Sequence, residues 1–168
     1  MTLFSVAIIT ISDKGAAGIR NDESGKMIHK MIEKLPGNVV GYEISPDQIE
    51  KIQKQIFRFC DMKAVDLLFT TGGTGPSPRD VTPEATAPLI DKPFPGISEM
   101  LRMCGYQKNP MAILSRGVSG IRGKTLIINL PGSPKAVEEG LTLLLPILPH
   151  ALKKIAGDEK DCGVLPTA

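Results

Sequence analysis

Apolar residues along this chain fall into short unbroken runs that alternate with segments of helical period. The first run, Leu3–Ile11, is rich in Val and Ile and predicts a buried parallel strand. Similar runs predict strands at Val39–Ile44, Val65–Phe69, Met111–Leu114 and Thr125–Asn129. Val118–Arg122, between glycine-marked turns, is a candidate for one more short strand.

Between the runs, apolar residues recur with the 3.6-residue period of amphipathic helices. Capping residues and prolines mark the expected helix starts: the cap Asp22, the cap Ser45 with Pro46, the cap Thr82 with Pro83, Pro95, and the cap Ser133 with Pro134. Gly105 is expected to end the helix from Pro95. Pro146 and Pro149 are expected to kink or interrupt the last helix.

Strands alternating with helices predict βαβ units around a mostly parallel sheet. The expected fold class is α/β, a three-layer α/β/α single domain of Rossmann-like kind. A length of 168 residues suits one domain with its own core. We assign this domain to residues 1–157 and expect a loosely packed polar tail over residues 158–168.

Composition excludes several classes of protein. A net charge of +2 with interspersed signs gives no basic footprint for nucleic acid, and the chain has no Trp for base stacking. The odd count of three cysteines, without C-x-x-C spacing, argues against a disulfide framework and a structural zinc. We expect no membrane span and, because Met1–Phe4 leads into a strand without a basic leader, a cytoplasmic protein.

The glycine-rich stretch Gly72-Gly73-Thr74-Gly75 directly follows the third predicted strand. Glycines let a ligand approach main-chain N–H groups, and Asp80 adds a carboxylate nearby, a combination that suits a phosphate carried with a metal ion. The stretch is neither a Walker A loop nor a G-x-G-x-x-G fingerprint. A purely structural connection between strand and helix remains the alternative interpretation.

Polar residues also follow the other predicted strands: Ser12-Asp13, Ser45-Pro46-Asp47 and Pro131-Gly132-Ser133. Ligands of such sheets bind at the carboxyl ends of the strands, so these loops are expected to form one site. Two carboxylates from separate loops suit Mg²⁺. Each has a structural alternative: Asp47 as a partner of a helix macrodipole, Asp80 as a turn residue, and Asp13 and Asp22 as turn and cap residues.

These motifs together resemble the MogA/MoaB family of molybdopterin adenylyltransferases, which includes the G domain of gephyrin. The resemblance covers residues 3 to about 156 and rests on ordered motifs: Ile11-Ser12-Asp13 with Asp22-Glu23-Ser24-Gly25, Ser45-Pro46-Asp47, Gly72–Gly75 with Arg79–Glu84, Leu114-Ser115-Arg116, and Leu130–Ala136. Lys14-Gly15-Ala16 and Pro76-Ser77-Pro78 depart from the family's variants and leave the subgroup open.

The resemblance implies transfer of AMP from Mg·ATP to the terminal phosphate of molybdopterin, with release of pyrophosphate. It implies Asp47 and Asp80 as catalytic residues and Mg²⁺ ligands. The implied nucleotide or phosphate contacts are Gly72, Gly73, Thr74, Gly75, Pro131, Gly132 and Ser133. The implied molybdopterin contacts are Asp13, Asp22, Ser24, Ser115 and Arg116. It also implies a homotrimer that hands its product to a molybdenum-insertion enzyme.

Two other functions compete with this one. A MoaB-like module that binds molybdopterin without catalysis has the same motifs, and intact Asp47 and Asp80 weigh only weakly against it. A nicotinamide-dependent oxidoreductase is disfavoured because G-x-G-x-x-G is absent. Without the resemblance, the residues indicate only an α/β protein that binds phosphate or an Mg-nucleotide.

Overall fold

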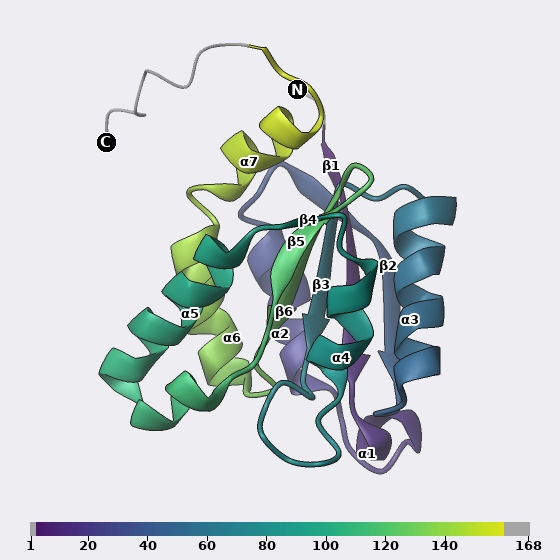
Figure 1. Ribbon diagram of the computed structural model, residues 1–168, viewed down its shortest axis with the longest axis vertical. Coiled ribbons are helices and arrows are strands. Elements are labelled where there is room, and N and C mark those ends of the chain that lie inside the picture. Colours follow the sequence, from purple (N-terminus) through teal and green to yellow (C-terminus); the bar gives the residue numbers. More distant parts are fainter. Residues whose placement is uncertain (1–2, 160–168) are drawn as a thin grey trace.

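A six-stranded, mostly parallel sheet organises the molecule, seen in a computed structural model that describes residues 3–159 (Figure 1). The strand order is β2-β1-β3-β6-β5-β4. The parallel strands are β1 (Phe4–Ile11), β2 (Gly37–Ser45), β3 (Leu67–Thr71) and β6 (Thr125–Leu130). The short strands β5 (Ser119–Arg122) and β4 (Lys92–Pro93) run antiparallel at one edge.

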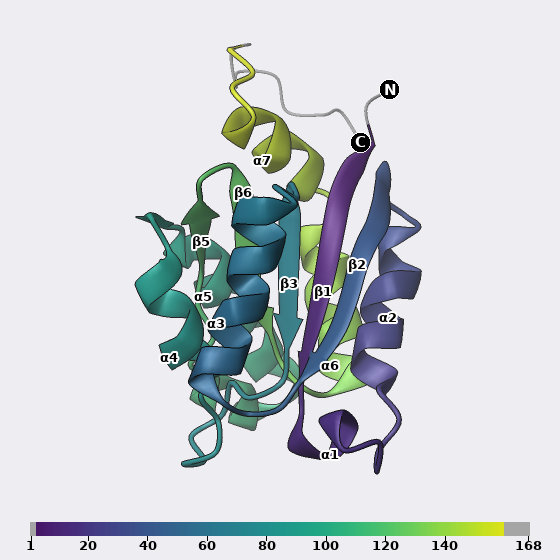
Figure 2. The same ribbon diagram turned by 90° about the vertical axis from the view of Figure 1, so that its right-hand side faces the viewer.

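Helices cover both faces of the sheet, which confirms the three-layer prediction (Figure 2). One face packs against α2 (Glu23–Ile32), α5 (Pro95–Lys108), α6 (Pro134–Leu144) and α7 (Leu148–Ile155). The other packs against α3 (Ile49–Phe57), the π-helix η1 (Arg58–Met62), α4 (Thr82–Thr86) and the 3₁₀-helix η2 (Ala87–Leu89).

The side-chain alternation of β1 explains both layers. Val6 and Ile8 enter the core beneath α2 and α6, whereas Ala7 and Ile9 enter the core beneath α3. All of them are fully buried, as expected for a strand that is covered on both faces. The apolar runs therefore specify a central sheet whose strand ends are the places left for polar residues.

Several boundaries differ from the predicted ones. Met111–Leu114 is not a strand but part of the 3₁₀-helix η3 (Pro110–Leu114), because Asn109 accepts a hydrogen bond from the Met111 N–H at 3.1 Å and caps a turn. Gly105 does not end α5, which continues to Lys108. The candidate short strand at Val118–Arg122 is confirmed as β5, and the expected interruption of the last helix at Pro146 is confirmed by the break between α6 and α7.

Two expected helix starts are also wrong. The helix after β2 begins at Ile49, with Gln48 as its N-cap, so Asp47 lies in the preceding loop and not in a first helical turn. Thr82 is not an N-cap, because its hydroxyl donates instead to the Gly72 carbonyl at 2.9 Å and Val81 takes the cap position. Asp47 and Thr82 therefore make their contacts with the loops at the strand ends and not within a helix start.

The carboxyl ends of the parallel strands meet at one end of the molecule, the lower end in Figure 1. A four-residue helix, α1 (Asp13–Ala16), follows β1 there, with Ser12 as its cap. The expected tail lies almost entirely outside the described residues, as does Cys162. Among the described residues, no helix is long and apolar enough to cross a membrane.

Candidate active site

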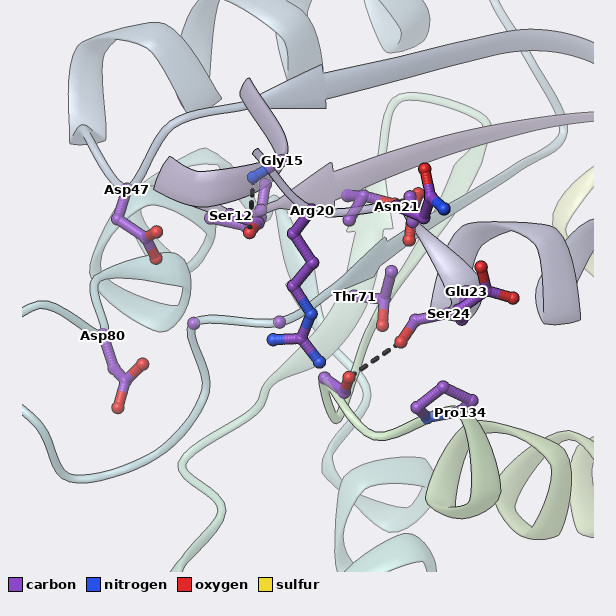
Figure 3. A pocket seen from close by; sticks show the side chains of 16 residues that line it. Ser12, Gly15, Arg20, Asn21, Glu23, Ser24, Asp47, Thr71, Asp80 and Pro134 are labelled. Carbon is purple, nitrogen blue, oxygen red and sulfur yellow. Dashed lines mark hydrogen bonds between the residues drawn. The ribbon is translucent and has the colours of Figure 1, made fainter. Parts of the chain in front are cut away.

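A cavity of about 240 Å³ lies at this end of the sheet (Figure 3). Loops after β1, β2, β3 and β6 contribute to its walls, as the strand-end argument predicted. Its lining residues are Thr10, Ile11, Ser12, Gly15, Arg20, Asn21, Asp22, Glu23, Ser24, Asp47, Thr71, Gly72, Gly73, Asp80, Gly132 and Pro134. Of the predicted site residues, the cavity brings together Asp22, Ser24, Asp47, Gly72, Gly73, Asp80 and Gly132.

Asp47 is held in place by a reciprocal pair of hydrogen bonds with Asp13. The Asp13 N–H donates to Oδ2 of Asp47 at 3.0 Å, and the Asp47 N–H donates to Oδ1 of Asp13 at 3.1 Å. Burial raises the pKa of the Asp47 carboxyl, and the nearby charges of Asp13 and Asp80 act in the same direction. A cation bound near both Asp47 and Asp80 would therefore stabilise the ionised form of Asp47.

Asp13 does not line the cavity, but its hydrogen bonds hold Asp47 in position. Its own carboxylate forms an ion pair with Arg79, and that hydrogen bond, together with the one from the Asp47 backbone, lowers the pKa of Asp13. Asp13 therefore remains ionised and keeps its backbone in place. The contact also ties the loop after β1 to the loop after β3.

The glycine turn after β3 takes backbone conformations that disfavour other residues. Gly72 has φ +95° and Gly73 has φ +61°. A Cβ on Gly73 would stand 3.0 Å from Oδ1 of Asp47 and would also crowd the Thr82 hydroxyl. The backbone of Gly73 thus lies against a site carboxylate with no room for a side chain.

Asp80 folds back over the end of the same loop. Its Oδ2 accepts a hydrogen bond from the Ser77 N–H at 3.0 Å, and its N–H donates to the Ser77 carbonyl at 2.9 Å. This is the turn geometry of the structural alternative, yet the side chain also lines the cavity, on the same side as Asp47 (Figure 3). Asp80 therefore has the contacts of a turn residue and still reaches the cavity.

The turn between β6 and α6 is fixed by hydroxyls from neighbouring elements. The Ser24 hydroxyl donates to the Gly132 carbonyl at 2.7 Å, and the Thr71 hydroxyl donates to the Pro131 carbonyl at 2.6 Å. Ser133 caps α6, and its own side chain lies outside the cavity lining. The start of α6 is thereby held against the cavity wall (Figure 3).

Asp22 caps α2 and also anchors a polar cluster at the cavity wall. Its Oδ1 accepts from the Gly25 N–H at 2.8 Å, while Thr10 and Tyr42 both donate to Oδ2. Burial and the hydrogen bond to Asp22 raise the pKa of the Tyr42 hydroxyl well above its usual value, so the phenol remains a donor. The predicted cap role of Asp22 is confirmed.

The segment Ser115–Arg116 lies outside the cavity, as do Thr74, Gly75 and Pro131. Arg116 instead holds the glycine loop: its Nε donates to the Gly75 carbonyl at 2.9 Å and one terminal nitrogen donates to the Asp80 carbonyl at 2.6 Å. It also pairs with Glu84, an interaction that lowers the pKa of that carboxyl. These contacts orient the loop that carries Asp80.

Sequence reasoning missed several lining residues, above all Arg20, Asn21 and Thr71. Arg20 and Asn21 immediately precede Asp22, and their position in a loop after the first strand was an available signal. Thr71 is fully buried at the end of β3. Because Thr71 ends an apolar strand, the sequence pattern assigns it to the core and gives no sign that it lines the cavity.

The donor set fits a hard divalent cation with few protein ligands. Asp47 and Asp80 each engage one carboxylate oxygen with a backbone N–H, which leaves the second oxygen of each available. The described residues contain no group of three or more His, Cys, Asp or Glu side chains suited to a metal. Two carboxylates suit Mg²⁺, which keeps several waters and takes further ligands from substrate phosphates.

Comparison with known proteins identifies the family of the chain. Residues 7–150 match the family described as a probable molybdopterin binding domain. The chain is 41% identical over 160 residues to a molybdopterin adenylyltransferase from Helicobacter pylori, an alignment that covers 94% of this chain and 91% of that protein. It is also 41% identical to gephyrin from Dictyostelium discoideum, over 93% of this chain and 23% of that much longer protein.

A solved structure of similar fold is that of the molybdopterin biosynthesis enzyme MoaB from Thermus thermophilus. Its TM-score is 0.88 with 48% sequence identity, covering 93% of this chain and 98% of that one. The similarity therefore extends over nearly the whole chain and is not confined to the glycine-rich motif.

Proposed function

This chain belongs to the molybdopterin-binding domain family, and we propose that it is a molybdopterin adenylyltransferase of molybdenum cofactor biosynthesis. It transfers AMP from ATP to the terminal phosphate of molybdopterin and releases pyrophosphate. The observation that carries the proposal is that Asp47, Asp80 and the Gly72–Gly73 turn line one cavity. Both substrates are small anionic molecules.

The chain's residues act in this reaction by binding and orientation. The bond between the α- and β-phosphates of ATP breaks, and a bond forms between the molybdopterin phosphate and the α-phosphorus. Because a phosphate nucleophile is already ionised near pH 7, the reaction needs no general base. The backbone N–H groups of Gly73 and of the start of α6 stabilise charge that develops on phosphate oxygens, whereas the Gly72 N–H donates to the Leu130 carbonyl.

Asp47 and Asp80 are the residues that would hold Mg²⁺ in this site. The ion, when bound, supplies charge neutralisation of the phosphates and of the leaving pyrophosphate. Asp13 keeps the Asp47 loop in place, and Arg116 keeps the Asp80 loop in place. The carboxylates therefore meet the substrate in positions set before it binds.

The direct test is incubation of the purified protein with ATP, Mg²⁺ and molybdopterin. We expect molybdopterin–AMP and pyrophosphate in equal amounts, and neither product when Mg²⁺ is withheld. A protein that binds molybdopterin but turns over no ATP is the MoaB-like binding module instead. Normal turnover in excess chelator rules out the metal role of the two carboxylates.

We also propose a homotrimer, as the family resemblance implies. An exposed apolar patch along α5 and η3 supports self-association: Met103, Tyr106, Met111, Ile113 and Leu114 are 46–63% exposed. Light scattering is expected to give three times the 18.0 kDa chain mass, and a monomer mass at micromolar concentration contradicts the trimer.

We further propose a cytoplasmic protein, as the sequence pattern suggested, that passes its product to a molybdenum-insertion enzyme, as the resemblance implies. An adenylated molybdopterin is an activated intermediate, and direct transfer protects it from hydrolysis. Fractionation of cells, followed by capture of the partner with the adenylate bound, tests both points.

A further inference from the structure

Arg20 is the most unusual charged residue of the cavity. It lies in the loop between α1 and α2, is exposed, and its side chain extends into the cavity between the Asp47–Asp80 side and the Ser24–Pro134 side (Figure 3). Its backbone N–H donates to the Lys14 carbonyl at 3.2 Å, which holds the loop. Within residues 3–159, no side chain or carbonyl forms a hydrogen bond or ion pair with its guanidinium.

The freedom of this guanidinium contrasts with other arginines of the molecule. Arg79 pairs with Asp13, Arg116 with Glu84, and Arg122 with Asp61. Arg20 keeps its full set of N–H donors for something that enters the cavity. A guanidinium matches phosphate oxygens in a two-bond geometry, which makes it a preferred phosphate ligand.

The charge of the cavity lining strengthens this argument. Apart from Arg20, the charged lining side chains are all carboxylates: Asp22, Glu23, Asp47 and Asp80. Asp22 is engaged as a helix cap, and Glu23 forms an exposed pair with Lys26. A cavity of this charge repels polyphosphates unless cations compensate, and Arg20 is the cation that the described part of the lining provides.

We propose that Arg20 is a phosphate-binding residue of this site, which neutralises a phosphate group of ATP or of molybdopterin at the reacting end of the substrates. The proposal rests on the proposed function for the identity of its ligands. Both substrates carry phosphate groups, so the experiment tests each of them separately. Arg20 is expected to act through substrate binding and not through the fold, because its guanidinium forms no hydrogen bond or ion pair with the described residues.

The test compares Arg20→Gln with the matched variant Lys14→Gln in the full protein. Lys14 is also exposed and belongs to the neighbouring α1, but it lies outside the cavity, so both variants remove one positive charge from the same region. Calorimetry measures binding of Mg·ATP, of molybdopterin and of Mg·pyrophosphate, each alone. Arg20→Lys is the conservative variant, and thermal unfolding checks that every variant is folded.

Loss of a charged two-bond contact is expected to weaken binding of at least one substrate by about tenfold to a hundredfold. Lys14→Gln is expected to bind all three probes within about twofold of the parent protein, and Arg20→Lys to regain part of the loss. Loss on the ATP and pyrophosphate arms assigns Arg20 to the nucleotide, and loss on the molybdopterin arm assigns it to the pterin phosphate.

Two results overturn the inference: unchanged affinity of folded Arg20→Gln for all probes, or an equal loss in Lys14→Gln. Failure of the proposed function gives a different result. A parent protein that binds the probes through Arg20 but forms no adenylate keeps the phosphate-binding role and removes the transferase assignment. A parent protein that binds none of the three removes both.

Discussion

Two groups of charged residues lie on either side of the loop from Gly72 to Asp80. One group faces the cavity, and the other holds the loop in place. On the cavity side, Asp47 and Asp80 each keep one carboxylate oxygen free of protein partners. Outside the cavity, Arg116 donates hydrogen bonds to the Gly75 and Asp80 carbonyls and forms an ion pair with Glu84. Both groups belong to family-like motifs, so the motif alone does not separate residues that touch substrate from residues that hold the loop.

The largest expected effects belong to the cavity side. Asp80→Asn and Asp47→Asn each keep the shape of the side chain but remove a charge that a metal ligand needs. We expect turnover to fall by at least about a hundredfold for either variant. Rates of adenylate formation under saturating substrate measure the loss.

Stability supplies the contrast for these variants. Asparagine still accepts the backbone N–H bonds from Asp13 and Ser77, so the midpoint of thermal unfolding is expected to change little. Asp91→Asn is a matched control, because Asp91 accepts a hydrogen bond from the Gly123 N–H at 2.7 Å outside the cavity. Full turnover in Asp47→Asn or Asp80→Asn returns that residue to a structural role.

The next effect concerns the turn between the two groups. Gly73→Val forces a branched residue into φ +61°, which costs about 1–2 kcal/mol of folding stability, and crowds Asp47 and Thr82. We expect ATP affinity to fall by about tenfold or more and molybdopterin affinity to fall less. Calorimetry with each ligand alone measures both.

Gly123→Val separates backbone strain from crowding. Gly123 lies in the turn between β5 and β6, outside the cavity, and has φ +57°, but a Cβ there meets no atom within 4 Å. Its variant is expected to lose similar stability from the backbone alone while binding ATP normally. Equal ATP affinity in Gly73→Val and the parent protein contradicts the placement of the nucleotide at this turn.

The third expected effect lies outside the cavity. Arg116→Gln removes two bonds to loop carbonyls and one ion pair, so we expect a loss of about 1–2 kcal/mol in the free energy of unfolding. Because Asp80 then lies on a looser loop, turnover is expected to fall by about tenfold while the KM for molybdopterin stays constant. A rise in that KM alone instead makes Arg116 a substrate contact, as the resemblance implied.

The sequence predicted the architecture well because burial on both faces leaves a strong local pattern. The continuous apolar runs of β1 and β3 and the helical periods of α2 and α3 each identify their own element. The prediction of a strand at Met111–Leu114 was wrong, because an apolar run of that length suits a strand or a partly exposed turn equally well. Side-chain capping by Asn109 decided between them.

The site was predictable in part for the same reason. Parallel strands deliver their ends to one edge, so Asp47, Gly73 and Gly132 followed from strand positions alone. The direction of a side chain in a loop depends on tertiary contacts, which a one-dimensional pattern does not contain. The free guanidinium of Arg20 and the engaged one of Arg116 therefore needed the structure.

The smallest expected effect tests the ion pair between Arg116 and Glu84 by pH. The hydrogen bond from Arg116 lowers the folded-state pKa of Glu84 below its ordinary value of 4.5. A lowered folded-state pKa means that the pair stabilises the fold above pH 4.5, and that this stability is lost as the pH falls through the lower folded value. Since both side chains are 39–45% exposed, the contribution is less than about 1 kcal/mol.

Urea unfolding of the parent protein and of Glu84→Gln between pH 7 and pH 3 measures this contribution. We expect the parent protein to be slightly more stable at pH 7 and the difference to shrink below pH 4.5. Turnover of Glu84→Gln at pH 7 is expected to stay within about twofold of the parent, because Arg116 retains its bonds to the Gly75 and Asp80 carbonyls. A difference in stability that grows on acidification contradicts the pair, and a large loss of turnover means that Glu84, and not the carbonyl contacts, keeps Arg116 on the loop.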